Sequence, residues 1–181
     1  IPDHGKVIGH VGRLVPVKNQ IKILHILSAL RSKRDDVWLV MVGDGPLLST
    51  LRAVAAELRL NDRVVWAGAR VDATDVMQSF DVMVVTSFSE SFGLVIVEGQ
   101  ATGVPIVASD AVPDEAFAAR SAWSRRIPLD APLSAWVTAV CDGLGQAPDR
   151  YAAREMFRAS HLEITTNLET LMWLYRQSVA A

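Results

Sequence analysis

The chain has 181 residues, of which 50% are hydrophobic and 21% charged, and its formal net charge is -2 at pH 7. This composition is typical of one folded domain, and it excludes a disordered chain and a nonspecific nucleic-acid binder, which would need a basic excess. With Cys141 as its single cysteine and no apolar run near the roughly 20 residues of a membrane span, residues 1–181 are expected to form one domain in a reducing cytoplasm.

Short β-branched runs alternate with segments of helical period along the first two thirds of the chain. The helical segments carry apolar residues at three- and four-residue spacing, as at Ile23, Leu27 and Leu30. Strands that alternate with helices in this way are typical of a parallel sheet covered on both faces. The predicted strands are Val7–Val11, Val37–Val42, Val64–Ala67, Val82–Thr86 and Ile106–Ala108.

Prolines interrupt this pattern after Asp110. The remaining periodicity predicts helices around Leu133–Leu144, Tyr151–Ala159 and Ile164–Val179, and a short last strand at Ile127. The predicted fold class is therefore α/β, a Rossmann-like doubly wound parallel sheet of about six strands.

The loop after the fourth predicted strand carries an expected anion site. In open parallel sheets, ligands bind beyond the carboxyl ends of the strands. Here a small polar loop enters a helix at about Phe92, so the free amides of Phe92, Gly93 and Leu94 would present the positive end of the helix dipole to a phosphate. Gly93 has no side chain, which lets a ligand approach the backbone closely.

Two glutamates flank this helix start. Glu98 lies four to six residues into the helix, about 6–9 Å along its axis, which is close to the distance from a pyrophosphate to a ribose. Glu90 precedes the helix and would face the group on the other side of the pyrophosphate. Taken singly, each glutamate is more often a capping or surface residue, but their placement on both sides of a glycine-bearing helix start favours a binding role.

The first loop offers two cations beside the same sheet edge. Arg13 and Lys18 flank a turn at Pro16, before a helix expected to begin near Asn19 as its N-cap. Each alone is more often a solvent-facing charge. Together they could neutralise a diphosphate and stabilise it as it leaves.

Glycines and an arginine in the other loops complete the candidate set. Gly43 serves a tight turn or, like Gly12, lines the ligand site, and Pro46 suits a first helical position. Arg70 follows the third strand and either covers a nucleotide base or lies on the surface.

Other chemistries find less support. The four histidines show no paired ligand spacing, and the absence of an Asp-x-Asp motif gives no reason to expect a metal at the diphosphate. Gly9-His10-Val11-Gly12 lacks the third glycine of a dinucleotide fingerprint. Two alternatives remain open: a glycoside hydrolase or epimerase that uses Glu90 and Glu98 as its acid/base pair, and a noncatalytic nucleotide- or NAD-binding module.

Four motifs in order resemble the C-terminal, nucleotide-sugar-binding domain of glycosyltransferase family 4, the retaining enzymes of GT-B fold, including bacterial capsule and exopolysaccharide transferases. The most specific is Glu-Ser-Phe-Gly-Leu-Val-Ile-Val-Glu, with seven residues between Glu90 and Glu98. The others are Val-Gly-Arg-Leu with Lys18-Asn19, Val-Gly-Asp-Gly-Pro-Leu, and Gly-Val-Pro-Ile-Val-Ala-Ser-Asp from Gly103. The usual Gly-Gly-x-x-Glu segment is replaced by Ala111-Val112-Pro113-Asp114-Glu115.

The resemblance implies a role for each candidate residue. Arg13 and Lys18 would contact the donor diphosphate, Glu90 the transferred sugar and Glu98 the ribose. The amides of Phe92 to Val95 would hold phosphate and sugar, and Arg70 would lie by the base. The donor would be a nucleotide-diphosphate sugar, used without metal or cofactor and with retention of the anomeric configuration.

The resemblance also implies partners outside this chain. The family's N-terminal domain holds the acceptor, here a sugar or lipid-linked sugar, and that domain is expected to be missing. The isolated domain should then bind nucleotide and turn over little or nothing. The full-length protein would lie in the cytoplasm or at the inner face of the membrane.

Overall fold

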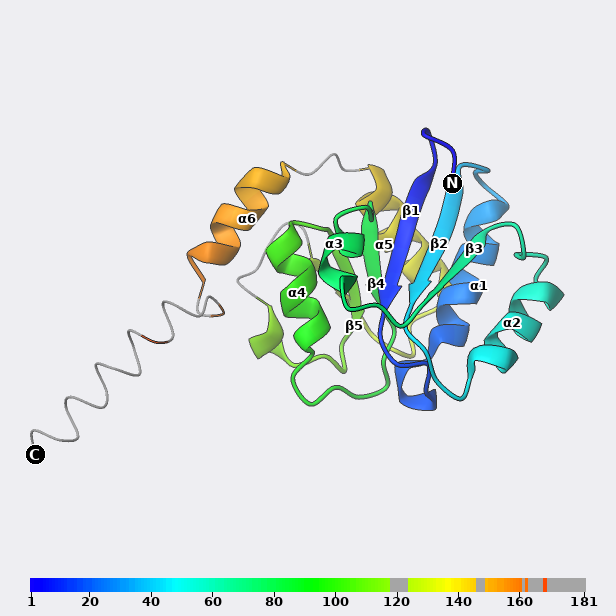
Figure 1. Cartoon of the computed structure of the whole chain (residues 1–181), viewed down its shortest axis with the longest axis horizontal. Coiled ribbons are helices and arrows are strands. Elements are labelled where there is room, and N and C mark those ends of the chain that lie inside the picture. Colours follow the sequence, from blue (N-terminus) through cyan, green and yellow to red (C-terminus); the bar gives the residue numbers. More distant parts are fainter. Residues whose placement is uncertain (118–123, 146–148, 161, 163–167, 169–181) are drawn as a thin grey trace, which may run out of the picture.

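The computed structural model describes residues 1–117, 124–145, 149–160, 162 and 168. Its centre is a sheet in the order β3-β2-β1-β4-β5-β6, and every pair of neighbouring strands is parallel (Figure 1). The sequence placed five of the strands within one residue at each end and the sixth at Ile127. The strands are β1 (Lys6–Val11), β2 (Val37–Val42), β3 (Val64–Gly68), β4 (Val82–Val85), β5 (Ile106–Ser109) and β6 (Ser124–Ile127).

Helices cover both faces of the sheet (Figure 1). One apolar cluster joins the first face to α1 (Gln20–Arg31), α2 (Leu48–Glu57) and α5 (Leu133–Gly145). A second cluster joins the other face to α3 (Ala73–Met77) and α4 (Leu94–Thr102), and α6 (Arg150–Arg158) packs against α4. The doubly wound α/β fold predicted from the sequence is confirmed.

The inner strands β2 and β4 are hydrophobic at every residue because both of their faces are covered. In β4, Val82 and Val84 belong to the first cluster, whereas Met83 and Val85 belong to the second. The predicted stripe of Ile23, Leu27 and Leu30 is likewise fully buried on α1. The helices expected near Leu133 and Tyr151 are α5 and α6, while the helix expected over Ile164–Val179 lies outside the described residues.

Of three predicted helix starts, one was right and two were displaced. The helix expected near Asn19 is α1, which begins at Gln20 with Asn19 as its N-cap residue, although Asn19 has a left-handed backbone (φ 52°) and its side chain forms no capping hydrogen bond. Pro46 lies outside α2, which begins at Leu48. The fourth helix begins at Leu94 rather than Phe92, because left-handed Gly93 (φ 88°) reverses the chain first.

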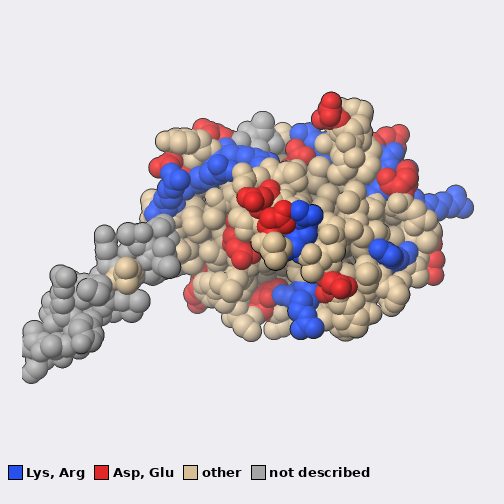
Figure 2. Space-filling model, viewed as in Figure 1, with Lys and Arg blue, Asp and Glu red and all other residues tan. Residues whose placement is uncertain are grey.

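A band of basic side chains runs beside α6 in Figure 2. The guanidinium of Arg150 donates to the carbonyls of Gln78 and Phe80, and that of Arg154 donates to the carbonyl of Thr102. These bonds attach α6 to the ends of α3 and α4. Arg150 and Arg154 therefore have a structural role, since they hold α6 in place.

Backbone contacts join the loops at the carboxyl ends of β1, β2 and β3. Gly12 N–H donates to the carbonyl of Val42 (3.0 Å), and Gly43 N–H donates to that of Gly68 (2.8 Å). Gly43 has a positive φ of 134°, and a Cβ on it would lie 1.9 Å from the carbonyl oxygen of Gly12. This close approach is reason enough for a glycine at position 43.

Replacement of Gly43 by alanine should therefore destabilise the fold. Backbone strain and the clash with Gly12 should lower the free energy of unfolding by roughly 2–4 kcal/mol, measured by chemical denaturation. Gly12→Ala is the matched control, because a Cβ at Gly12 would lie 3.5 Å from its nearest neighbour, Nε2 of His10. Equal stability of the two variants would contradict this account of Gly43.

Candidate functional site

The strand order reverses between β1 and β4, so the connections after these two strands run to opposite sides of the sheet. Open parallel sheets bind ligands at such a switch point, beyond the strand ends. The loop after β1 carries Arg13 and Lys18, and the loop after β4 carries Glu90. The two loops are in contact, because Phe88 N–H donates to the carbonyl of Val17 (2.8 Å).

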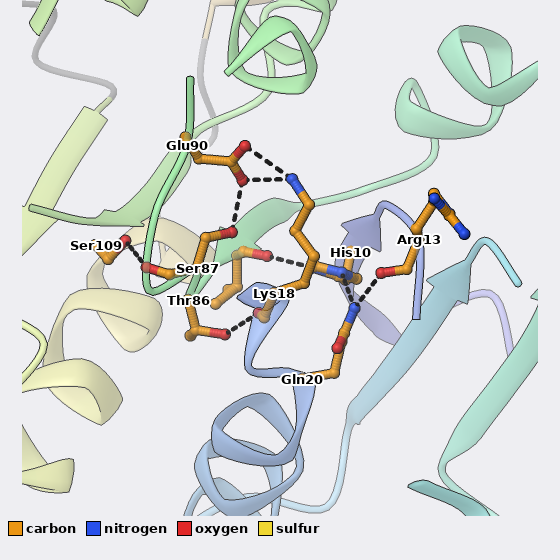
Figure 3. A network of polar contacts seen from close by, with 9 residues as sticks. His10, Arg13, Lys18, Gln20, Thr86, Ser87, Glu90 and Ser109 are labelled. Atoms are coloured by element: carbon orange, nitrogen blue, oxygen red, sulfur yellow. Dashed lines mark hydrogen bonds and ion pairs between the residues drawn. The ribbon is translucent and has the colours of Figure 1, made fainter. Parts of the chain in front are cut away.

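An ion pair connects these loops at the switch point (Figure 3). Lys18 Nζ donates to both carboxylate oxygens of Glu90, at 2.7 and 2.8 Å, and Ser87 Oγ donates to Glu90 Oε1 at 2.6 Å. The side chains of Lys18 and Glu90 are only 22% and 8% exposed. The fold thus brings together two charges that the sequence placed 72 residues apart.

Arg13 and Glu98 are two further charged candidates, and both are exposed. Neither side chain forms a hydrogen bond or ion pair with any residue that the structure describes. In Figure 3 the guanidinium of Arg13 extends away from the Lys18–Glu90 pair. Lys18 and Glu90 therefore neutralise each other, whereas Arg13 and Glu98 keep their charges available for a ligand.

The start of α4 presents backbone donors directly after the loop of Glu90. No amide from Phe92 to Val95 donates to an acceptor within the described ranges, and the first amide to do so is that of Ile96, to the carbonyl of Gly93 (2.8 Å). These groups lie at the positive end of the helix dipole. Gly93 also serves the fold, because its left-handed conformation disfavours any other residue.

The remaining candidates lie in neighbouring loops. Gly12 has no packing neighbour that requires a glycine, so its bare backbone could admit a ligand. Arg70 is exposed and bonds Asp72 through Nε (2.7 Å) and Nη2 (2.5 Å). The hydrogen bonds from Arg70 lower the pKa of the Asp72 carboxyl. No printed contact among the described residues joins Arg70 to Lys18 or Glu90.

Sequence reasoning missed a set of buried polar residues beneath the ion pair. Each is a polar residue within or directly after an otherwise apolar strand, or at the first position of an apolar helix, and hydrophobic periodicity does not single such residues out. The set consists of His10, Gln20, Thr86, Ser87 and Ser109.

His10 is the titratable residue of this set, and burial changes its pKa. Its Nδ1 lies 3.0 Å from the carbonyl oxygen of Val84, which can only accept, so Nδ1 carries the proton. Burial lowers the pKa of His10 to about 4, against the opposing effect of the Val84 bond. The imidazole is therefore neutral at pH 7.

The glycine of the partial dinucleotide fingerprint has a packing role. A Cβ on Gly9 would lie 1.8 Å from Cδ2 of Phe80, a fully buried ring. Gly9 thus makes room for Phe80 rather than for a pyrophosphate. No group of three or more His, Cys, Asp or Glu residues is placed to hold a metal, and no helix is long and apolar enough to cross a bilayer, in the ranges that the structure describes.

Residues 1–118 match the family described as glycosyl transferases group 1. The chain belongs to this family. Family membership favours a transferase over the hydrolase, epimerase and noncatalytic alternatives, and GT-B glycosyltransferases are among the solved structures of the same fold.

Three known proteins illustrate the similarity of this group 1 domain. It is 29% identical over 173 residues to the putative glycosyltransferase EpsF of Bacillus subtilis, covering 95% of this chain and 45% of that protein. It is 35% identical over 117 residues to the D-inositol 3-phosphate glycosyltransferase of Corynebacterium efficiens, covering 60% and 28%. The crystal structure of Anabaena HepE in complex with UDP-glucose superposes with a TM-score of 0.77 at 25% identity, covering 95% and 49%. The chain thus spans less than half of each relative.

Burial of His10 should make stability depend on pH. The unfolded imidazole takes up a proton near pH 6.5 and the folded one only near pH 4, so the unfolded state binds more protons between these values. Acidification through this window should therefore lower the free energy of unfolding by about 3 kcal/mol through this group.

Denaturant titrations across this pH window test the effect of His10. His10→Gln should lose this part of the pH dependence, and the same replacement at exposed His25 controls for the loss of an imidazole. An unchanged pH dependence in His10→Gln would show that the buried ring does not cause it.

Removal of one partner of the Lys18–Glu90 pair should be costly, because the other charge stays nearly buried. Lys18→Met should lower the free energy of unfolding by about 2–3 kcal/mol. Lys6→Met is the control, since the pair of Lys6 with Asp81 is 40% and 26% exposed and should contribute at most about 1 kcal/mol. If urea unfolding gave the same decrease in the free energy of unfolding for both variants, burial of the Lys18–Glu90 pair would not affect its contribution to stability.

Proposed function

We propose that this chain is the donor-binding domain of a retaining, metal-independent hexosyltransferase of glycosyltransferase family 4. The enzyme moves a sugar from a nucleotide-diphosphate sugar to an acceptor. The observation that carries the proposal is the nearly buried Lys18–Glu90 pair at the switch point, beside the unpaired amides at the start of α4.

In this proposal, cationic and backbone donors bind the diphosphate. The amides from Phe92 to Val95 and the guanidinium of Arg13 have no partner among the described residues and are free to bind phosphate oxygens. An ammonium has three donors, and Lys18 uses two of them on Glu90, which leaves one for a phosphate oxygen. These donors stabilise the charge of the diphosphate as it leaves, which is the task otherwise done by a metal.

The acidic residues bind the two ends of the donor. Glu90, fixed by Lys18 and Ser87, accepts hydrogen bonds from hydroxyls of the transferred sugar. Glu98, the fifth residue of α4, accepts from the ribose hydroxyls. The backbone at Gly12 and Gly43 lines the donor site, and the guanidinium of Arg70 covers the base.

The known proteins support this assignment. HepE was crystallised with UDP-glucose, and EpsF is named a putative glycosyltransferase. We therefore extend the proposal to polysaccharide or glycoconjugate synthesis, with a sugar or lipid-linked sugar as acceptor. A second α/β half supplies the acceptor site, so the isolated domain binds donor without turnover. The single cysteine fits a reducing cytoplasm. The full-length enzyme lies in the cytoplasm or at the inner face of the membrane.

Calorimetric titration with UDP, GDP and ADP in excess chelator tests the proposal. The wild-type domain should bind one of the three nucleotides. Arg13→Gln should weaken that affinity by about 10- to 100-fold, because a charge-assisted bond to phosphate is lost. Lys33→Gln removes the same charge from an exposed position just beyond the other end of α1 and should leave the affinity unchanged.

Absence of heat for all three nucleotides would count against donor binding by this domain. Equal affinity of Arg13→Gln and wild type would remove Arg13 from the site. Binding that appears only after addition of Mg²⁺ would contradict metal independence.

A further inference from the structure

Two polar side chains lie buried directly behind the ion pair. His10 is the fifth residue of β1, and Gln20 is the first residue of α1. Their exposed fractions are 1% and 0%, and their neighbours in the sheet and helix are aliphatic. A leucine or methionine would suit such surroundings better than either residue.

Gln20 bridges the end of β1 and the loop of Arg13 (Figure 3). Its Nε2 donates to the carbonyl of Arg13 at 2.7 Å and lies 3.4 Å from Nε2 of His10. Because the Arg13 carbonyl can only accept, the amide nitrogen of Gln20 must face it. His10 in turn donates through Nδ1 to Val84, so the bridge is anchored on β4.

Hydroxyl groups complete the connection between the two loops. Thr86 Oγ1, just after β4, lies 3.2 and 2.8 Å from the carbonyls of Lys18 and Asn19. Ser109 Oγ donates to the carbonyl of Ser87 at 2.7 Å, and Ser87 holds Glu90. Buried side chains from β1, α1, β5 and the segment just after β4 therefore fix the backbone of the loops that carry the charged site residues.

Stability does not account for this arrangement. Gln20 Oε1 is buried without a hydrogen-bond partner among the described residues, which disfavours the folded state. His10 cannot take up its proton until about pH 4, which disfavours the folded state further in acid. The pair is therefore better explained by the bonds that its nitrogens make than by packing.

We propose that Gln20, supported by His10, is a positioning residue that holds the loop of Arg13 in its nucleotide-binding conformation before the ligand arrives. The inference rests on the proposed function. Its physical basis is preorganisation: a loop already fixed by buried hydrogen bonds loses less conformational entropy on binding.

Gln20→Met tests the inference, because methionine has similar length and no N–H donor. Affinity for the nucleotide that the wild type binds best should fall about 5- to 10-fold, while the unfolding temperature stays unchanged or rises. Gln100→Met is the matched control: Gln100 Nε2 also donates to a carbonyl, that of Ala116 at 2.7 Å, but outside the loop of Arg13. Gln20→Leu repeats the test with another apolar shape.

A double-mutant cycle shows whether Gln20 acts through Arg13. In the Arg13→Gln background, Gln20→Met should weaken nucleotide binding less than twofold, because the side chain that it positions is already gone. The same fold-change in both backgrounds would overturn the inference, and so would an affinity loss that merely follows a fall in unfolding temperature.

Amide hydrogen exchange of the ligand-free protein gives an answer that is independent of nucleotide binding. Amides between residues 12 and 19 should exchange faster in Gln20→Met than in wild type, while those in the middle of α1 stay protected. Unchanged exchange in the loop overturns the inference even if nucleotides bind. If the wild type binds no nucleotide but the loop exchanges faster in the variant, the proposed function is contradicted while the ordering role of Gln20 is supported.

Discussion

The structure of the site depends on one interaction, the ion pair of Lys18 with Glu90 across the point where the strand order reverses. The two residues stand on loops that leave the sheet in opposite directions, so their pairing fixes the separation of those loops. Because both side chains are largely removed from water, each charge needs the other. The opposite charges of Lys18 and Glu90 cancel each other at the centre of the site. Arg13 and Glu98 are exposed and have no charged partner among the described residues.

The polar residues below the pair extend this constraint into the core. Gln20 and His10 tie the first loop to β4, and Ser87 and Ser109 tie the fourth loop to β5. Sites work best when the residues around the functional groups are themselves fixed. The apolar clusters on both faces of the sheet stabilise the fold, and this stabilisation offsets the free-energy cost of burying the polar residues.

The sequence predicted the fold well because the strands and helices of a doubly wound sheet can be recognised from short-range hydrophobic patterns. Strands buried on both faces appear as continuous apolar runs, and the helix stripe of Ile23, Leu27 and Leu30 repeats every turn. The helix starts at Leu48 and Leu94 were displaced because they depend on backbone turns, such as left-handed Gly93, that no periodicity records. Among the candidate site residues, Lys18 and Glu90 were singled out because each stands in a loop after a predicted strand, and the pairing of β1 with β4 then brings them into contact.

By itself, the sequence determined the strand and helix content, the loops that carry chemistry and the identity of the charged residues on them. Only the tertiary structure decided which charges meet, that Arg13 and Glu98 stay unpaired within the described residues, and that Gln20 lies beneath the loop of Arg13. The physical reason is range. Hydrophobic period and turn chemistry act over a few residues, whereas the partner of a buried polar group is chosen by the packing of segments about 70 residues apart in the chain.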